Sequence, residues 1–294
     1  ALGTATAGSD GAWSFTPATA LSAAVHSITA KSKDAAGNIS LASTAIAVTV
    51  DLTAPNKPVL IAPVSATNNT KPAITGTAEA LSTVTVYDGT TSLGTVAASS
   101  TGAWSFSPSV ELTEGAHTIT ATARDVAGNL SPASAPVTLT IDLTAPNKPV
   151  LTTATGATNN TKPVIAGTAE AGSTVTVYDG STAMGTAQAS STGAWTFTPT
   201  TALAVGDRSI TAKAKDVAGN VSEASAAITL TVDTTAPNKP VLTTANTTTN
   251  NTKPTIAGTA EANSTVTVYD GTTALGTATA GSDGAWSFTP VSYT

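Results

Sequence analysis

One block of sequence recurs along this chain with a constant period of 91 residues. The tryptophans mark the step, because Trp13, Trp104, Trp195 and Trp286 follow one another at that spacing without insertion or deletion. Residues 1–17 recur unchanged as residues 274–290, three periods later. Self-similarity at a fixed period of this length predicts an array of small domains, and such arrays usually serve as spacers or stalks.

The period also divides the chain. Its 294 residues hold about three domains of the repeat length, each within the usual size range of a domain. We predict two complete repeats, 52–142 and 143–233, flanked by the later strands of a repeat in 1–51 and the earlier strands of another in 234–294. Neither flanking piece can close a domain alone, since each leaves apolar strand edges open. We therefore expect this chain to be a section of a longer array.

The composition predicts small cores. Hydrophobic residues make up 40% of the chain, but Ala and Val dominate them, and aromatic residues reach only 4%. Each core must therefore be built around one Trp and one Phe with β-branched neighbours. Charged residues are scarce, at 10%, as in some disordered linkers. The regular alternation of β-branched and polar residues favours folded strands instead.

Charge and cysteine content narrow the classes of partner and location. A net charge of −6 and a pI near 4.7 disfavour nucleic acid and anionic membranes, which need clustered Lys and Arg. Apolar runs stay well short of the roughly 18 residues of a membrane helix, so we expect no membrane insertion. The chain has no Cys. Small secreted eukaryotic domains usually carry disulfides, so this absence favours a bacterial surface protein.

The third copy shows the strand pattern most clearly. Short stretches of alternating residues are separated by Gly, Asn and Asp turn signals about every 8 to 12 residues, without a helical period. Asp179-Gly180 is a hairpin signal between two of these stretches. The predicted strands cover residues 148–151, 163–168, 174–178, 184–189, 193–197, 207–215 and 228–232.

These seven short strands predict an all-β fold. Each repeat is expected to be an antiparallel immunoglobulin-like β-sandwich that lacks the immunoglobulin disulfide. The segment between repeats, Asp-Leu-Thr-Ala-Pro-Asn-Lys-Pro at 142–149, is short and is stiffened by two prolines. Neighbouring domains should therefore touch and stand nearly in line, so that tandem sandwiches form an elongated rod.

Acidic residues recur where the loops of such a sandwich meet the preceding domain. In an immunoglobulin-like fold, the loop after the second strand and the loop after the sixth strand lie at the end where the chain enters. One carboxylate of the linker and one from each of these loops should converge there, together with an Asn. The set is Asp142, Glu170, Asp216 and Asn220 in one copy, Asp51, Glu79, Asp125 and Asn129 in another, and Asp233 and Glu261 at the third junction.

Convergent carboxylates repel one another unless a cation neutralises them, and Ca²⁺ with its preference for oxygen ligands suits that role. A calcium ion would clamp the linker to the next domain and stiffen the array. The same residues also have a purely local explanation. Asp142 then caps a turn, Asp216 forms an Asx-turn within its own loop, and Glu170 is solvated.

Other polar residues give weaker signals. His26 and His117 occupy equivalent positions, the third copy has Arg208 there, and no nucleophile or orienting carboxylate recurs beside them, so we interpret them as strand-surface residues and predict no enzymatic activity. The hairpins explain Asp88, Asp179 and Asp270. Exposed tyrosines could bind sugar rings, although cross-strand packing also accounts for Tyr87, Tyr178 and Tyr269.

Several motifs resemble the bacterial immunoglobulin-like repeats of giant surface adhesins. They are Asp-x-Thr-Ala-Pro in the linkers, Gly-Thr-Ala-Glu at 167–170, Ser-Thr-Val-Thr-Val-Tyr-Asp-Gly at 173–180, and Lys-Asp-Val-Ala-Gly-Asn-x-Ser at 215–222. The resemblance covers the chain up to residue 290. It implies type I-secreted, biofilm-associated proteins whose repeats extend a terminal adhesive region, with Ca²⁺ at the junctions. On that resemblance, Asp51, Glu79, Asp125, Asp142, Glu170 and Asp216 are calcium ligands.

The expected function is that of a structural extender in a bacterial adhesin at the cell surface or in a biofilm matrix. Its expected partners are neighbouring repeats of the same chain, other copies of itself, and host-cell or matrix glycans reached through distal domains. Two alternatives remain open. In one, the Tyr-bearing face binds carbohydrate or matrix directly, and in the other, repeats self-associate into filaments.

Overall fold

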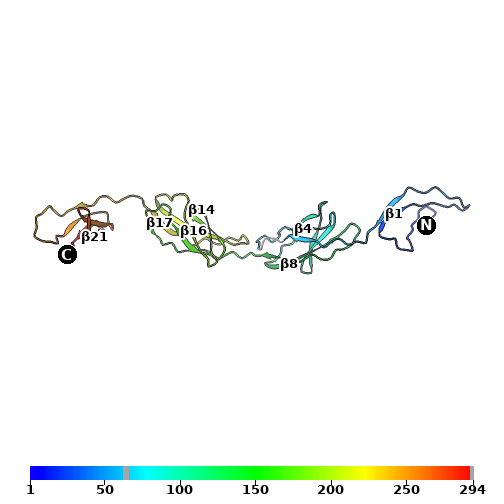
Figure 1. Ribbon diagram of the computed structural model, residues 1–294, viewed down its shortest axis with the longest axis horizontal. Coiled ribbons are helices and arrows are strands. Elements are labelled where there is room, and N and C mark those ends of the chain that lie inside the picture. The colour runs from blue at the N-terminus through cyan, green and yellow to red at the C-terminus, as the bar shows by residue number, and fades with distance from the viewer. Residues whose placement is uncertain (62–65, 292–294) are drawn as a thin grey trace.

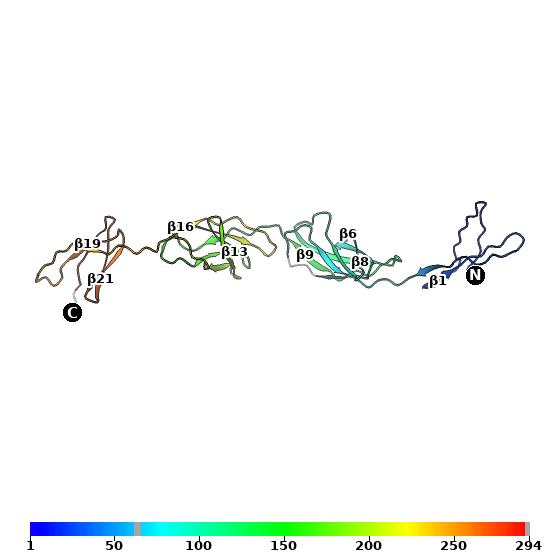
Figure 2. The same ribbon diagram turned by 90° about the horizontal axis from the view of Figure 1, so that it is seen from above.

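The computed structural model of this protein describes residues 1–61 and 66–291. Four units follow one another in single file along one long axis, with the two termini in opposite end units (Figure 1). The view turned by 90° has the same elongated outline (Figure 2). All regular elements among the described residues are strands. The described part of the chain contains no helix that is long and apolar enough to span a membrane. We number the units as repeats 1 to 4, following the predicted division at residues 51, 142 and 233.

Repeat 3 is a sandwich of two sheets. The first sheet contains β10 (Val150–Leu151), β12 (Ile165–Thr168) and β15 (Ala194–Phe197), in that order. The second has the order β11-β17-β16-β13-β14, formed by β11 (Gly156–Thr158), β17 (Ile228–Val232), β16 (Gly206–Lys215), β13 (Thr174–Asp179) and β14 (Thr182–Gln188). Neighbours pair antiparallel, except that β11 runs parallel to β17. This is the immunoglobulin-like topology that the sequence predicts.

Repeat 2 has the same architecture. One sheet contains β3 (Val59–Ile61), β4 (Ile74–Thr77) and β7 (Ala103–Phe106), and the other has the order β6-β5-β8-β9, formed by β6 (Thr91–Ala97), β5 (Thr83–Asp88), β8 (Gly115–Arg124) and β9 (Val137–Ile141). A parallel bridge from Thr67 to Ile141 stands where repeat 3 has β11.

The end units contain parts of the same sandwich. Repeat 1 has β1 (Ala24–Ile28) paired with β2 (Ile46–Val50). Repeat 4 has β18 (Val241–Leu242), β19 (Ile256–Thr259) and β22 (Ala285–Phe288) in one sheet, and the hairpin of β20 (Thr265–Asp270) and β21 (Thr273–Thr279). The last residues of the chain, 292–294, lie outside the described residues.

Alternation along the strands places the core between the two sheets. In repeat 3, Val175 and Val177 of β13 and Ile210 of β16 are fully buried, and Trp195 of β15 packs with them. Repeat 2 builds its core in the same way. The prediction of a small core around one Trp in each complete repeat is confirmed.

In repeats 2, 3 and 4 the tryptophan lies close against a glycine of the neighbouring strand. Gly167 of β12 pairs with Trp195 of β15. A β-carbon at Gly167 would lie 2.6 Å from Cζ2 of Trp195 and would also overlap the backbone oxygen of Val150. Gly76 and Gly258 have the same close neighbours in their repeats. The Gly in the Gly-Thr-Ala-Glu motif is therefore required by the close approach of three strands.

Two features of the fold differ from the sequence-based expectations. The return strand β14 begins at Thr182, two residues before the predicted start, because the hairpin pairs Asp179 directly with Thr182. Strand β11 was not predicted, since three residues that begin with Gly show no periodicity. It forms because the chain crosses to the second sheet after β10 and pairs there with β17.

Candidate functional site

The end at which the chain enters repeat 3 gathers the linker and two loops. Val150 of β10 pairs with Thr168 of β12, and Thr174 of β13 pairs with Lys215 of β16. Residues 169–173 and 216–220 therefore lie at the same end of the sandwich as the linker 142–149. We call residues 216–220, and their equivalents 125–129 and 34–38, the Asp–Asn loop.

The Asp–Asn loop is closed by its own hydrogen bonds. Both the Gly219 and the Asn220 backbone N–H groups donate to Oδ1 of Asp216, at 2.6 and 2.8 Å. The side-chain amide of Asn220 donates to Oδ2 of Asp216 at 2.8 Å. The backbone N–H of Asp216 donates to the Asn220 carbonyl at 3.0 Å. Asp216 is thus the centre of an Asx-type turn, as the local explanation of this residue expects.

The same Asn amide also binds the linker. Nδ2 of Asn220 donates to the backbone carbonyl of Asp142 at 2.9 Å. In repeat 2, Nδ2 of Asn129 donates to the backbone carbonyl of Asp51 at 3.0 Å and to Oδ2 of Asp125 at 2.8 Å. The contact between Asn and the linker therefore occurs at both described joints that have a complete Asp–Asn loop after them.

The linker aspartates direct their carboxylates along the linker. Oδ1 of Asp142 accepts the backbone N–H of Thr144 at 3.0 Å, and the same short turn recurs at Asp51 with Thr53 and at Asp233 with Thr235. It is the carbonyl of Asp142, and not its carboxylate, that faces the Asp–Asn loop. The turn-capping explanation accounts for these bonds.

The glutamates of the set lie apart from the loop aspartates. Glu79, Glu170 and Glu261 are exposed. Oγ of Ser173 donates to the backbone carbonyl of Glu170 at 2.7 Å, which closes the turn before β13. The Glu170 side chain borders a shallow depression beside Asn147 and Lys148 of the linker. It makes no hydrogen bond or ion pair with the described residues.

The carboxylates at this end of repeat 3 accept hydrogen bonds or are exposed. Within residues 1–61 and 66–291, no three acidic or His side chains gather closely enough to hold a metal ion. Both carboxylate oxygens of Asp216 already accept N–H donors. In repeat 2, the side-chain amide of Asn129, with the loop's backbone N–H groups, holds the pKa of Asp125 below its usual range against a smaller opposing effect of desolvation. Calcium at the joints stays a prediction from the sequence.

A contact between repeats that the sequence did not disclose lies beside this loop. The backbone N–H of Asn68, in repeat 2, donates to the carbonyl of Ala218, in repeat 3, at 3.0 Å. Ala218 is buried, whereas its equivalent Ala127 is exposed. No residue of this chain occupies the position equivalent to Asn68 before repeat 2. Repeats 2 and 3 therefore touch directly, and the contact covers the Asp–Asn loop of repeat 3.

The linker is also tied to the repeat that it leaves. Oγ1 of Thr144 donates to Oε1 of Glu114 at 2.6 Å, and the backbone N–H of Asp142 donates to the Thr67 carbonyl at 3.0 Å. Residues 142–144 are therefore bonded to both neighbours of the joint. Glu114 has no acidic equivalent in repeat 3, where Val205 stands at that position.

The histidines require a correction. His117 is buried rather than a strand-surface residue, and its Nδ1 lies 2.7 Å from Oδ2 of Asp88, while its Nε2 lies 2.8 Å from the Thr113 carbonyl. Burial lowers the pKa of His117, but the hydrogen bonds to Thr113 and Asp88 and the charge of Asp88 together raise it by more, so the pKa lies above its usual value. In repeat 3, Arg208 forms the equivalent ion pair, with Nε 3.0 Å from Oδ2 of Asp179.

These pairs explain a residue pattern that hairpin chemistry alone does not. The hairpin aspartates Asp88 and Asp179 pair with a basic side chain on the facing strand, at the end of the repeat opposite to the Asp–Asn loop. The interaction ties the hairpin to the facing strand. Tyr87 and Tyr178, next to these aspartates, are half-buried. They therefore offer less surface to a sugar ring than the sequence suggested.

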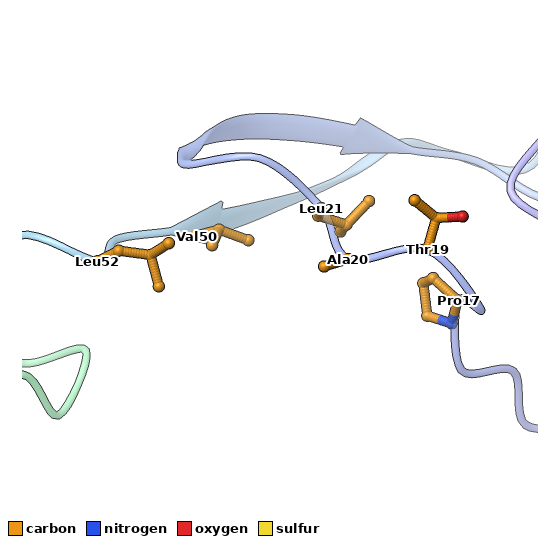
Figure 3. Close-up of a pocket in the computed structure, with 6 residues that line it drawn as sticks. All are labelled: Pro17, Thr19, Ala20, Leu21, Val50 and Leu52. Carbon is orange, nitrogen blue, oxygen red and sulfur yellow. The ribbon is translucent and has the colours of Figure 1, made fainter.

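An open apolar depression belongs to an incomplete core. It is lined by Pro17, Thr19, Ala20, Leu21 and Val50 of repeat 1 and by Leu52 at the start of the linker (Figure 3). In repeat 2 the residues equivalent to Leu21 and Val50 are Leu112 and Ile141, which are buried, and the Leu112 N–H donates to the Thr70 carbonyl. The depression in repeat 1 is thus the place where the first strands of a complete repeat pack.

Comparisons with known proteins give one family. The family model "Bacterial Ig-like domain" matches residues 1–52, 65–143, 152–234 and 242–294. No curated protein matches the chain.

Three of the solved structures that match the chain have TM-scores below 0.5. A tetra-tandem repeat in the extending region of a large adhesion protein is 24% identical over 99% of this chain and 79% of its own, with a TM-score of 0.28. The BSP domain of a biofilm-associated protein is 21% identical over 62% of this chain, with a TM-score of 0.26, and the match spans 30% of that protein's chain. A marsupial T cell receptor is 8% identical over 80% of this chain and 92% of its own, with a TM-score of 0.42.

Proposed function

Because the chain belongs to the bacterial Ig-like domain family, we propose that it is a non-enzymatic extender. In this role it forms part of the stalk of a bacterial surface or biofilm adhesin and holds a distal binding region away from the cell. Its work is mechanical, so the relevant properties are its length and its resistance to bending at the joints.

The single-file arrangement of the repeats carries this proposal. Each unit follows the last along one axis, so every added repeat adds to the reach of the chain (Figures 1 and 2). The linkers support the same role. Pro146 and Pro149 of the second linker are buried, and residues 142–144 are hydrogen-bonded to both neighbours. A linker held in this way transmits orientation from one repeat to the next.

Small-angle scattering of the whole chain tests the role. A globular chain of this length has a radius of gyration of about 19 Å. We expect a radius about twice as large, with a scattering profile typical of a rod. A radius close to the globular value, or a profile typical of beads on a loose string, contradicts the extender role.

Direct recognition of carbohydrate is the weaker alternative, because Tyr87 and Tyr178 are half-buried in the complete repeats. A glycan array tests it with the chain and its Tyr178→Ala variant. Retention that depends on Tyr178 favours a binding module. Absence of binding leaves the extender role as the better account.

A further inference from the structure

We propose that successive repeats are locked in line by an amide clamp, in which the side chain of Asn220 or Asn129 bridges the loop aspartate and the linker carbonyl, and that this joint closes without a divalent cation. The inference rests on the proposed extender function and specifies how its joints are held. It replaces metal ligation by hydrogen bonds between residues that the structure places in contact.

The clamp uses both hydrogens of one amide group. An Asn side-chain NH₂ has two donors. In Asn220 they serve Oδ2 of Asp216, at 2.8 Å, and the Asp142 carbonyl, at 2.9 Å. The same two bonds occur at Asn129, with the aspartate and linker carbonyl of its own joint. One side chain thus joins a loop of the following repeat to the linker that leads into it, at two independent joints.

The loop that presents this amide is formed before any linker reaches it. In repeat 1 no linker precedes the Asp–Asn loop in this chain. Even so, Asn38 donates from its backbone N–H to Oδ1 of Asp34 at 2.8 Å, and from Nδ2 to Oδ2 of Asp34 at 2.7 Å. The amide is therefore held in its docking position by the loop alone. A pre-organised donor loses little conformational freedom when the linker carbonyl binds to it.

The preceding repeat adds a second contact at the joint between repeats 2 and 3. The Asn68 N–H binds the Ala218 carbonyl at 3.0 Å, and a β-carbon at Gly219 would lie 3.3 Å from Oδ1 of Asn68. The loop is thus held from two directions, by the linker and by the turn of the preceding repeat. Two separate attachments resist bending in a way that one flexible contact cannot.

The electrostatics of the loop are satisfied without a cation. N–H groups of Gly219 and Asn220 and the Asn220 amide surround the Asp216 carboxylate. The Asp142 carboxylate is used in its own turn with Thr144, and the Glu170 carboxylate is exposed. Since N–H donors bind the carboxylates of Asp216 and Asp142 and the carboxylate of Glu170 is exposed, the joint does not need a positive ion to hold them together.

The test measures the angle of the joint directly. The chain has no Cys, so Thr90→Cys and Ser181→Cys place one label on the exposed hairpin of repeat 2 and one on that of repeat 3. Pulsed electron spin resonance then gives the distribution of distances between the labels. Samples contain excess chelator or saturating calcium, in the full chain and in the Asn220→Leu, Asn220→Asp and Val217→Thr variants. Val217 is an exposed residue of the same loop and serves as the matched control.

We expect a narrow distribution in chelator that calcium does not change. Both Asn220 variants should broaden it, with the population of open joints rising about fivefold, the factor for one lost hydrogen bond of about 1 kcal/mol. Val217→Thr should match the parent chain. Hydrogen exchange of β13 and β16 shows whether repeat 3 stays folded, and Asn220→Asp preserves the side-chain shape if Asn220→Leu does not fold.

Other outcomes separate the clamp from the extender role. A distribution that is narrow only with calcium overturns the metal-free clamp, and so does a narrow distribution that neither Asn220 variant changes. In both cases the chain can still be elongated in scattering, and the extender role stands. A compact scattering profile contradicts the extender role itself.

Discussion

The contact between Gly167 and Trp195 makes a sharp test of how each repeat is stabilised. Gly167→Ala adds one methyl group where no space exists, since its carbon would lie 2.6 Å from Cζ2 of Trp195 and would overlap the Val150 carbonyl. Ordinary contacts between carbon atoms are about 3.5–4.0 Å. Either the ring must leave its position in the core or β10 must move away from β12.

The cost follows from both responses. Overpacking of a core costs about 1–3 kcal/mol. Displacing β10 also weakens its short ladder with β12, in which a typical hydrogen bond contributes about 1 kcal/mol. Together these give roughly 2–4 kcal/mol for repeat 3. For a domain of this size that lowers the melting temperature by roughly 10–25 °C.

Calorimetry of the full chain, with hydrogen exchange to assign the change to repeat 3, provides the measurement. Gly180→Ala is the matched control, because Gly180 has a φ of 58° and a β-carbon there meets nothing within 4 Å. Its cost is backbone strain alone, about 1 kcal/mol. If Gly167→Ala lowers the melting temperature no more than Gly180→Ala does, the steric explanation of the close packing of β10, β12 and Trp195 is wrong.

Three further predictions concern single side chains. The raised pKa of His117 means that its protonated form stabilises folded repeat 2 fully below the unfolded pKa of about 6.5, and that this stabilisation is lost as the pH rises through the folded value. The free energy of unfolding of repeat 2, taken from hydrogen exchange after correction for the pH dependence of intrinsic exchange, should therefore fall over that range, and His117→Arg should abolish the fall. Ser222→Ala removes the Oγ atom that accepts the buried Ala214 N–H and should cost roughly 1–3 kcal/mol by denaturant titration, whereas Ser190→Ala, at an exposed turn, should cost less. Thr144→Val removes the exposed hydrogen bond to Glu114, so the free energy of unfolding measured by thermal melting should fall by no more than about 1 kcal/mol. A larger loss of stability would show that this bond holds the linker.

Strand alternation made most of the fold predictable. Val175 and Val177 point to one face by their spacing, and the burial of both is what period-2 patterning requires. The sequence was less informative where neighbouring strands decide the outcome. His117 stands at the same position as Arg208, and nothing local shows that the position faces Asp88 across the sheet and not solvent. Registers between strands determine that pairing.

The joint shows a different limit. Topology alone brought Asp142 and Asp216 to one end of the repeat, and that expectation agrees with the observed pairing of β13 with β16. The direction of each functional group depends on local turns. The Asp142 carboxylate caps the Thr144 N–H, which leaves its carbonyl to meet Asn220. Spacing placed Asp142, Asp216 and Asn220 at one end of the repeat, but it did not show which of their atoms meet.

The location of the clamp also bears on how an array of near-identical repeats folds. Adjacent similar domains can exchange strands during folding, so contacts between them are safest when they form late. The Asp–Asn loop of repeat 1 makes its internal bonds without a preceding linker. Docking adds one amide bond to the linker at each of the two later joints, and one backbone bond to Ala218 at the joint between repeats 2 and 3. Because these contacts use completed loops and no core strand, each sandwich can close first and the rod can straighten afterwards.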